Sequence, residues 1–416
     1  MTKYEVKDIK LAKQGLMNIE LAEMEMYALL EVQKVFRKTR PFRNKTIGLA
    51  LHITKETAVL VKTLKAGGAN VAITGCNPLS TQDDIAAALV KEGINVFGQR
   101  GQTTKEYYEN LNSVLDFKPD VTIDDGCDLV TLVHTDRREL LDSITGGTEE
   151  TTTGIIRLHA MEKDGVLKYP VIAVNDNKTK HLMDNYYGTG QSTLDGIIRA
   201  TNILIAGKTV VVAGYGSCGK GTAMRAKGLG AKIIVTEVDA FPALQAMMDG
   251  FRVMEMSDAV KEGDIYVTLT GNKHVIRMEH MDKMKEGAIV CNSGHFDVEI
   301  DTKELRKNAK TVRTVRPNLE EYVLKNGRKI FLIAEGRLVN LAAAEGHPSA
   351  IMSLSFCGQA LAAEYVLKND LDAKVHYLPE SIDDYISKLQ LSAMDVKIDK
   401  LTPEQIKYLA SWKEGT

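Results

Sequence analysis

Residues 208–239 read KTVVVAGYGSCGKGTAMRAKGLGAKIIVTEVD, and this stretch decides the fold. An apolar run leads directly into the pattern G-x-G-x-x-G, which is formed by Gly214, Gly216 and Gly219. The first two glycines permit a tight turn and a close approach of the backbone to a ligand, and Gly219 lets the following helix pack against the strand. The amino terminus of that helix then faces a pyrophosphate. The stretch therefore predicts a dinucleotide-binding strand–turn–helix unit.

An acidic residue about 20 positions further on identifies the dinucleotide. Glu237 ends the next predicted strand, where a carboxylate binds the ribose hydroxyls of NAD and repels the 2′-phosphate of NADP. The motif predicts NAD as the cofactor. The sequence Gly-Lys-Gly-Thr around Lys220 does not make a nucleoside triphosphate loop, because Gly221 stands where that loop needs Ser or Thr.

The composition of the chain indicates a globular enzyme that acts on small molecules. The chain has 416 residues, 44% of them hydrophobic, and a formal net charge of −2, which gives no reason to expect nucleic acid or an anionic membrane as a partner. The five cysteines are scattered and show neither a zinc spacing nor a disulfide framework, so we expect no metal and a reducing, cytoplasmic location. No apolar run approaches the roughly 20 residues that span a bilayer.

The rest of the chain alternates short β-branched runs with helical stretches, which is typical of α/β folds with parallel sheets. We expect strands at 46–53, 70–74, 94–98, 121–125, 171–174, 210–213, 233–237, 266–270, 288–292 and 330–334. Because roughly half of the chain precedes the glycine motif, we predict a Rossmann domain inserted in a split substrate-binding domain. The expected segments are 1–185 and 341–390 for the substrate-binding domain, 186–340 for the NAD-binding domain, and 391–416 for a small carboxyl-terminal oligomerisation segment.

Polar clusters follow the predicted strands of the amino-terminal half, at the positions where α/β folds place ligands. They occupy 52–56, 124–126, 149–154 and 175–185. Each has a purely structural alternative, since a run of Glu and Thr can cap a helix and Lys180 with Asp184 can form a surface ion pair. Four such clusters at strand ends or helix starts nevertheless favour a substrate site.

The chain resembles the S-adenosylhomocysteine hydrolase family over nearly its whole length. The matching stretches are LHITKETAVL (51–60), NPLSTQDDIAAAL (77–89), TIDDGCDL (122–129), EETTTG (149–154), VNDNKTKHLMDNYYG (174–188), VVAGYGSCGKG (211–221), AIVCNSGHFDVEID (288–301) and AEGRLVNLAAAEGHPS (334–349). The resemblance implies hydrolysis of S-adenosylhomocysteine to homocysteine and adenosine by 3′-oxidation with tightly held NAD, elimination, addition of water and re-reduction. It also implies a homotetramer.

The resemblance assigns a role to each polar cluster. Lys180 would accept the proton of the 3′-hydroxyl, which requires that burial lower its pKa against the influence of Asp184. Asp125 would be the base at C4′, and His52 and His295 would handle protons at C5′. The other implied catalytic or orienting residues are Glu150 at the ribose, Asp184, Asn175 and Asn185.

The remaining implied residues bind the purine or the cofactor. Base recognition would fall to Thr54, Glu56 and His347, with Met352 and Phe356 as apolar walls. The implied cofactor contacts are Thr151, Thr152, Thr153, Gly214, Gly216, Ser217, Cys218, Gly219, Glu237, Thr270, Asn292 and Asn340. For Thr270 and Asn292, capping of a loop is an equally simple explanation.

The chain departs from the family pattern at several positions. Thr189 stands where a cysteine is common beside the nicotinamide, Pro242 replaces a residue that usually helps to bind the cofactor ribose, and the tail ends QIKYLASWKEGT without the usual lysine and tyrosine that reach a neighbouring subunit. Glu345 stands where a methionine is common. If the Glu345 carboxylate points inward, it would accept the N1–H of hypoxanthine, so S-inosylhomocysteine is an alternative substrate.

Two functions of other classes stay open at this point. A 2-hydroxyacid dehydrogenase shares the inserted NAD-binding domain but leaves the polar clusters before residue 185 unexplained. A non-catalytic NAD-binding regulator would have no need for the acid–base residues Asp125, Lys180, Asp184 and His295.

Overall fold

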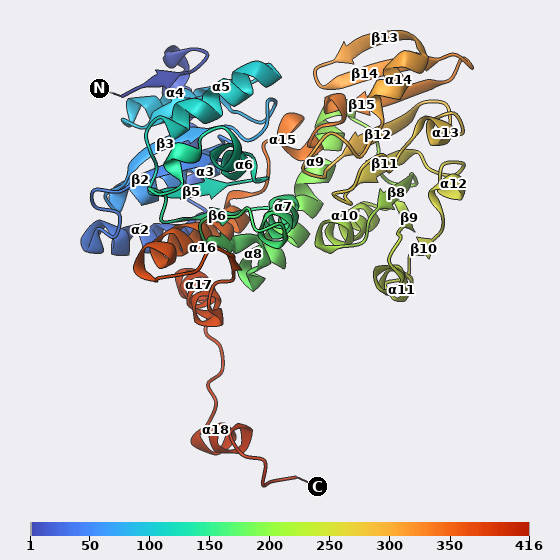
Figure 1. The fold of residues 1–416 in the computed structure, drawn as a ribbon. Helices are drawn as coiled ribbons and strands as arrows, with labels where there is room; N and C mark the ends of the chain where they lie inside the picture. The colour runs from blue at the N-terminus through green and yellow to red at the C-terminus, as the bar shows by residue number, and fades with distance from the viewer. Residues whose placement is uncertain (1, 416) are drawn as a thin grey trace.

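The computed structural model describes residues 2–415 and contains two eight-stranded sheets in neighbouring lobes (Figure 1). The sheet of the first lobe is entirely parallel and has the order β1-β4-β3-β2-β5-β6-β7-β16. Its strands are β1 (Tyr4–Glu5), β2 (Thr46–Ala50), β3 (Asn70–Thr74), β4 (Asn95–Phe97), β5 (Val121–Asp124), β6 (Gly146–Glu149), β7 (Val171–Ala173) and β16 (Val375–His376).

The sheet of the second lobe has the order β10-β9-β8-β11-β12-β15-β14-β13, and its last two strands run antiparallel to their neighbours. Its strands are β8 (Thr209–Ala213), β9 (Lys232–Thr236), β10 (Arg252–Val253), β11 (Ile265–Thr268), β12 (Ala288–Asn292), β13 (Ala309–Arg316), β14 (Leu319–Leu324) and β15 (Lys329–Ile333). The order reverses between β8 and β11, and a ligand is expected at such a switch point.

Helices cover both faces of each sheet, so the central strands are buried on both sides and read as apolar runs. The helices of the first lobe are α1 (Ala12–Glu23), α2 (Tyr27–Thr39), α3 (Lys55–Ala66), α4 (Asp83–Lys91), α5 (Thr104–Leu115), α6 (Asp128–Thr135), α7 (Thr152–Lys163), α8 (Lys178–His181), α16 (Ser349–Lys368) and α17 (Glu380–Ala393). Those of the second lobe are α9 (Thr189–Thr201), α10 (Ser217–Gly228), α11 (Ala240–Met248), α12 (Met256–Ala259), α13 (Met278–Met281), α14 (Thr302–Asn308) and α15 (Val339–Ala342).

Short turns complete the chain between these elements. They are the 3₁₀ turns η1 (Ile9–Leu11), η2 (Arg138–Leu140), η3 (Val174–Asp176) and η5 (Ala334–Gly336), and the π-helical turn η4 (Asp184–Gly188). The π-helical turn lies at the start of the first crossing between the lobes, and π turns are frequent at functional sites.

The chain crosses between the lobes twice, once at α9 and once between α15 and α16. After the second crossing it returns to the first sheet, where β16 pairs in parallel with β7. The expected α/β class with two parallel-sheet domains is therefore confirmed, whereas the exact domain boundaries stay a prediction.

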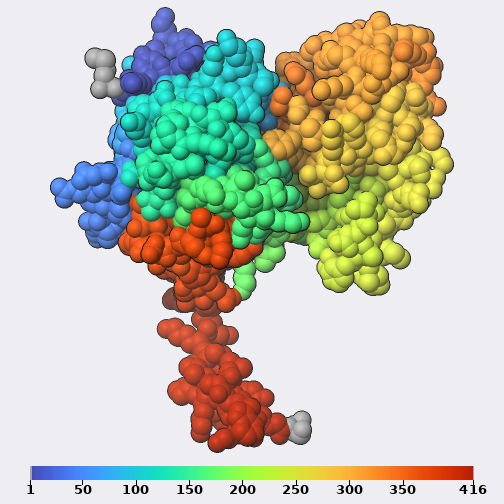
Figure 2. All heavy atoms as spheres, viewed as in Figure 1, coloured from blue at the N-terminus to red at the C-terminus, as the bar shows by residue number. Residues whose placement is uncertain are grey.

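The carboxyl-terminal segment leaves the body of the molecule after α17. Helix α18 (Pro403–Leu409) stands away from both lobes at the end of an extended stretch (Figures 1 and 2). None of its residues is buried, and Trp412 is 90% exposed. Its apolar side chains Ile406, Leu409 and Trp412 are therefore exposed in the described part of the chain.

Helix α16 is the one helix of the described residues that is long and apolar enough to cross a membrane. In its most apolar window 61% of the residues are buried inside the protein, and Phe356, Cys357 and Ala360 pack into the core of the first lobe. The apolar character of α16 is therefore explained by its place between the sheet and α2.

Candidate active site

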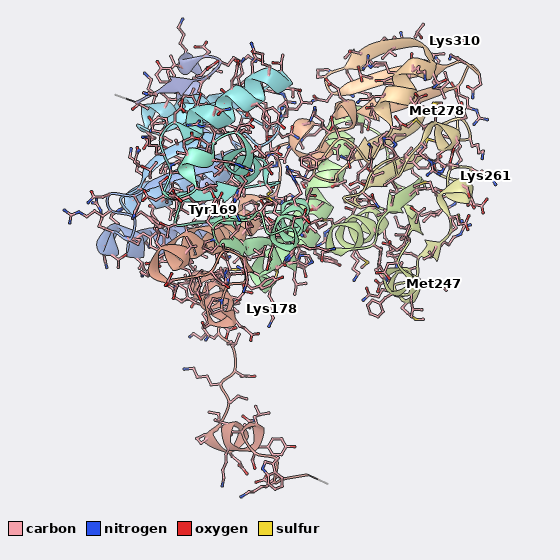
Figure 3. The ribbon with its side chains drawn as sticks, in the orientation of Figure 1. Tyr169, Lys178, Met247, Lys261, Met278 and Lys310 are labelled. Atoms are coloured by element: carbon pink, nitrogen blue, oxygen red, sulfur yellow. The ribbon has the colours of Figure 1, made fainter. Side chains whose placement is uncertain are left out.

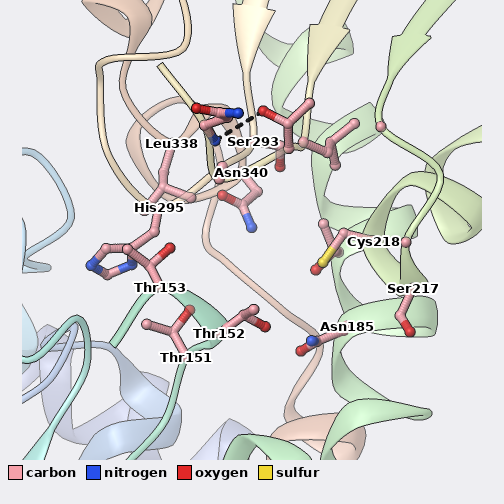
Figure 4. A pocket seen from close by; sticks show the side chains of 18 of the residues that line it. Thr151, Thr152, Thr153, Asn185, Ser217, Cys218, Ser293, His295, Leu338 and Asn340 are labelled. Atoms are coloured by element: carbon pink, nitrogen blue, oxygen red, sulfur yellow. Dashed lines mark hydrogen bonds between the residues drawn. The ribbon is translucent and has the colours of Figure 1, made fainter. Parts of the chain in front are cut away.

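One large cavity opens between the two lobes, at the carboxyl ends of the parallel strands. It measures about 840 Å³ and takes its walls from both lobes (Figure 4). That is the size of a site for small organic ligands. The predicted site residues that line it are His52, Thr54, Glu56, Asp125, Glu150, Thr151, Thr152, Thr153, Lys180, Asp184, Asn185, Gly214, Gly216, Ser217, Cys218, Glu237, Thr270, His295, Asn340, His347, Met352 and Phe356.

Four predicted residues lie outside the cavity lining: Asn175, Gly219, Asn292 and Glu345. Asn175 lies directly behind it and binds Lys180, at 3.3 Å from Oδ1 to Nζ. Gly219 acts in the fold, because a Cβ there would collide with the carbonyl oxygen of Gly214. The side chain of Asn292 hydrogen-bonds the backbone of Gly294 and Phe296 in the turn after β12, which agrees with the loop-capping alternative, and its contact with the cofactor stays a prediction.

Lys180 lies at the centre of a buried polar cluster on the substrate side of the cavity. Its Nζ is 2.8 Å from Oδ1 of Asn185, 3.3 Å from Oδ1 of Asp184 and 3.7 Å from Oε1 of Glu150. Burial alone lowers the pKa of Lys180, but the carboxylates of Asp184, Glu150 and Asp125 outweigh it and raise that pKa well above its ordinary value. The expectation that desolvation dominates is therefore wrong: Lys180 is an ammonium in this structure.

Glu150 is a buried acid that sits between the lysine and helix α16. Ser355 Oγ and Gln359 Nε2 of that helix each donate to one of its two carboxylate oxygens. Burial raises the pKa of Glu150 to about 7, against the opposing influence of Lys180. A group with this pKa exchanges protons at neutral pH. Neither Ser355 nor Gln359 was predicted. The only signal in the sequence is their spacing of one helical turn on α16, which places them on the same face of the helix.

Asp184 joins the lysine cluster to the residues expected at the base and the nicotinamide. His347 Nδ1 is 3.3 Å from Asp184 Oδ1, and its Nε2 is 3.3 Å from the hydroxyl of Thr189. Burial by itself raises the pKa of Asp184, but Lys180 and His347 lower it below its usual range. Asp184 is therefore an ionised acceptor that is held by Lys180 of α8 and by His347, which lies in the second crossing between the lobes.

Asp125 faces two histidines across the cavity. Its Oδ2 is 3.4 Å from His52 Nε2 and its Oδ1 is 3.6 Å from His295 Nδ1, so one carboxylate bridges the two lobes. Burial lowers the pKa of His52 to about 4, despite the opposing effect of Asp125, so its ring is neutral at pH 7. Gly126 makes this approach possible, because its φ is +106° and a Cβ there would collide with His295.

Two buried acids beneath the cavity hold the turns that carry these groups. Asp124 accepts from the backbone N–H groups of Asp125 (3.0 Å) and Val130 (2.9 Å). Glu149 accepts from those of Gly126 (2.9 Å) and Thr151 (3.0 Å) with one oxygen, and its other oxygen is buried without a hydrogen-bond partner in residues 2–415. Burial raises the pKa of Asp124 to about 7 and that of Glu149 well above its usual value.

The cofactor side has the features that the glycine motif predicts. Gly214 has φ +96°, and the Glu237 carboxylate accepts from the backbone N–H of Tyr215 at 2.7 Å. Asn340 donates to Ser192, while its Oδ1 is buried and has no hydrogen-bond partner among the residues that the structure describes. An unpaired buried acceptor in the cavity wall fits the amide N–H₂ of a nicotinamide. The residues present therefore fit NAD.

Glu345, which could have pointed toward the purine, lies at the rim of the cavity instead. Glu56 accepts from Ser349 Oγ at 2.6 Å and has Lys55 Nζ at 3.3 Å. The side chain of Glu345 is 54% exposed, and its carboxylate binds Lys55 at 2.9 Å and Arg199 at 2.8 Å. An inward-pointing Glu345 in contact with the purine is therefore not found, because two cations hold it at the rim.

Comparison with known proteins identifies the family. Residues 3–143 match the model of "S-adenosyl-L-homocysteine hydrolase", and residues 185–346 match that of "S-adenosyl-L-homocysteine hydrolase, NAD binding domain". The chain is 60% identical to an S-inosyl-L-homocysteine hydrolase of Methanocaldococcus jannaschii, with 99% of this chain and 100% of that protein covered. It is 58% identical to an adenosylhomocysteinase of Sulfurisphaera tokodaii and 56% identical to one of Aquifex aeolicus, each with the same coverage. The chain belongs to the S-adenosyl-L-homocysteine hydrolase family and has its NAD-binding domain.

Proposed function

We propose that the protein hydrolyses S-adenosyl-L-homocysteine to homocysteine and adenosine. The observation that carries this proposal is the junction of two acid–base clusters in one cavity: Lys180 with Glu150 and Asp184 on one side, and Asp125 with His52 and His295 on the other. A thioether is a poor leaving group, so its loss needs a carbon acid next to a ketone. NAD, when bound, supplies the hydride acceptor that makes this ketone and later returns the hydride.

The lysine cluster handles the 3′-hydroxyl in this proposal. Because Lys180 is an ammonium, it accepts the hydroxyl proton only after its own proton has moved. Glu150, with a pKa raised to about 7 by burial, is the neighbouring group that can take this proton at neutral pH. Asp184, Asn175 and Asn185 hold the ammonium in place. We therefore assign proton transfer to the Lys180–Glu150 pair rather than to the lysine alone.

The aspartate cluster handles the chemistry at C4′ and C5′. Asp125 is the base at C4′, and it is supported on both sides by imidazole nitrogens. The neutral ring of His52 and the ring of His295 then exchange protons with the departing thiolate and the incoming water. Because His295 comes from the second lobe, the cluster is complete only when the lobes are close together.

The purine is proposed as adenine, with hypoxanthine as the alternative. A relative named S-inosyl-L-homocysteine hydrolase and one named adenosylhomocysteinase match this chain almost equally well. Glu56 lies in the cavity wall beside Thr54 and can only accept when it is ionised, which suits the exocyclic amine of adenine and equally the N1–H of hypoxanthine. The kcat/KM values for S-adenosyl- and S-inosylhomocysteine decide between them.

The first test of the function follows the cofactor. We expect NAD to copurify, and turnover to release homocysteine without accumulation of free NADH, because the hydride is returned in each cycle. Release of one NADH per substrate would contradict the hydrolase and favour a dehydrogenase.

We also propose a homotetramer in the cytoplasm. The exposed residues Ile406, Leu409 and Trp412 of the carboxyl-terminal segment favour an intermolecular contact, and all five cysteines are free. Sedimentation of the full chain and of a chain that ends at residue 395 tests the assembly. If the truncated chain still formed an assembly with the same number of subunits as the full chain, the carboxyl-terminal segment would be excluded as the contact between subunits.

A further inference from the structure

Helix α8, which carries Lys180, is too short to hold its own position. It has four residues, Lys178–His181, and its N-cap residue Asn177 makes no capping bond with its side chain. The first N–H groups of a helix have no partner within the helix, and isolated helices of this length are unstable in water. A contact from outside α8 must therefore fix its first turn and the point from which the Lys180 side chain starts.

Asp383 of helix α17 supplies this contact, although it lies 205 positions beyond Lys178 in the chain. Its Oδ2 accepts from the backbone N–H of Lys178 at 2.6 Å. Its Oδ1 accepts from the backbone N–H of Thr179 at 3.1 Å and also from the Thr179 hydroxyl. Asp383 and Thr179 are both buried. Both carboxylate oxygens of Asp383 are therefore bound at the amino end of α8, and hydrogen bonds to a charged acceptor are the stronger kind.

Helix α17 is a firm base for this contact. Ile386, which follows Asp383 by one helical turn, is fully buried in the core of the first lobe. Lys178 also pairs with Glu380 of α17, but both side chains are largely exposed, so this second contact contributes little. The buried carboxylate is therefore the contact that decides where α8 lies.

We propose that Asp383 is a positioning residue that sets the place of the Lys180 ammonium. Lys180 follows Thr179 directly, and its Nζ lies 2.8 Å from Asn185 Oδ1 and 3.7 Å from Glu150 Oε1. A shift of α8 would change both distances, and a misplacement of about 1 Å in a catalytic group can cost about 100-fold in rate. The inference rests on the proposed role of the Lys180–Glu150 pair in 3′-oxidation.

An amide cannot replace the carboxylate in this position. The Asn side chain has one acceptor oxygen and an N–H₂ group, so one end of the amide would face a backbone N–H of α8. Asp383→Asn is therefore the disrupting variant, and Asp384→Asn, at the exposed neighbour on α17, is its matched control. Thr179→Val is a milder variant that removes only the hydroxyl donor.

The test measures 3′-oxidation alone in the NAD-loaded enzyme. The probe 5′-deoxyadenosine has a 3′-hydroxyl but no leaving group, so rapid mixing reports only the absorbance of bound reduced nicotinamide. We expect its rate constant to fall about tenfold or more in Asp383→Asn and about two- to fivefold in Thr179→Val, and to keep the wild-type value in Asp384→Asn. Amide hydrogens of residues 174–185 should exchange about tenfold faster in Asp383→Asn than in the control.

The rate constant separates positioning from a merely structural role. A variant that only loses stability would show a smaller amplitude with an unchanged rate constant, and this result in Asp383→Asn would overturn the proposal. Equal rate constants in Asp383→Asn and Asp384→Asn would overturn it as well. If Asp383→Asn does not fold, a wild-type rate constant in Thr179→Val overturns the proposal.

Lys180→Met separates the inference from the proposed function. Slow oxidation in Lys180→Met with a wild-type rate constant in Asp383→Asn would leave the function standing and refute the positioning role. Wild-type oxidation in Lys180→Met would refute the proposed role of the lysine. Amide exchange would then decide whether Asp383 orders α8, and equal exchange in Asp383→Asn and its control would refute that too.

Discussion

Removal of the Lys180 ammonium gives the sharpest test of the substrate cluster. The variant Lys180→Met keeps much of the side-chain volume but leaves two buried acids without their cation. Lys180 is 5%, Asp184 3% and Glu150 6% exposed, so solvent does not replace the lost charge. We expect both a loss of 3′-oxidation and a loss of stability that depends on pH.

The size of the stability loss follows from the burial of this cluster. Breaking a buried ion pair by removal of one partner costs about 3–5 kcal/mol. For a domain of this size each kcal/mol lowers the melting temperature by about 2–4 °C, so the decrease at pH 8 should be on the order of 10 °C. His347, 3.3 Å from Asp184, remains as a partner and favours the lower part of this range.

The sign of the pH dependence is fixed by the pKa of Asp184. In the wild type, Lys180 and His347 hold this pKa below its usual range, so the group contributes stability above its ordinary pKa that is lost as pH falls. Without the ammonium, burial raises the pKa of Asp184 instead, and the penalty of the buried charge disappears as the acid takes up a proton. The difference between variant and wild type should therefore be large at pH 8 and small at pH 5.

Calorimetric melting at both pH values and the absorbance of bound reduced nicotinamide are the two measurements. The control is Lys180→Met combined with Asp184→Asn, which removes both charges and should recover most of the melting temperature without activity. An equal loss at pH 5 and pH 8 would contradict the ionic account. Wild-type formation of reduced nicotinamide in Lys180→Met would remove the lysine from the oxidation step.

Three further predictions concern other parts of the cavity. Glu150→Gln should slow 3′-oxidation by about 10²–10⁴-fold and remove its rise with pH near 7, whereas an unchanged pH profile would show that another group takes the proton. Glu345→Met should change the ratio of kcat/KM for the adenosine and inosine substrates by less than about threefold, because its carboxylate binds two cations at the rim; a tenfold change would place it in base recognition. Gly126→Ala should lower stability by about 1–3 kcal/mol and homocysteine release at least tenfold, since its Cβ displaces His295; wild-type release in pre-steady-state assays would refute this.

The sequence predicted the features that depend on local patterns. The glycine motif at 214–219 and the apolar strands follow from turn chemistry and burial, and the structure has a strand within each of the ten predicted ranges or shifted from it by one residue. It did not reveal β6, because Gly146 and Gly147 give this central strand little β propensity. In the fold, these glycines lie where a Cβ would meet Val366 and Thr122, so close packing explains them.

What the sequence could not predict depends on residues far apart in the chain. Glu345 turns outward because Lys55 and Arg199, 290 and 146 positions away, lie at the rim. Lys180 keeps its proton because the fold places Glu150 beside Asp184. The hairpin of β13 and β14 was missed for a different, local reason: its two strands pair antiparallel although the sequence of β13 carries many charges. Exposed side chains such as Lys310, at the outer edge of this hairpin, leave no apolar pattern to read (Figure 3).

Two pairs of consecutive acids in the first lobe, Asp124-Asp125 and Glu149-Glu150, serve both the fold and the chemistry. Asp124 and Glu149 are the last residues of β5 and β6 and lie opposite each other in the parallel register. Successive residues of a strand point to opposite sides, so the first acid of each doublet turns into the protein and the second faces the cavity. The inner acids bind the backbone N–H groups of the turns that carry the outer ones.

Burial raises the pKa of both inner acids, so each takes up a proton more readily than an exposed acid does, which reduces the negative charge next to Asp125 and Glu150. The carbonyl oxygen of a neutral acid still accepts hydrogen bonds from backbone N–H groups, and a carboxylate there would repel the two acids that face the cavity. The chain can therefore concentrate four acids at two adjacent strand ends. The outer pair faces the cavity and a bound substrate, and the inner pair holds the turns of the outer pair in position.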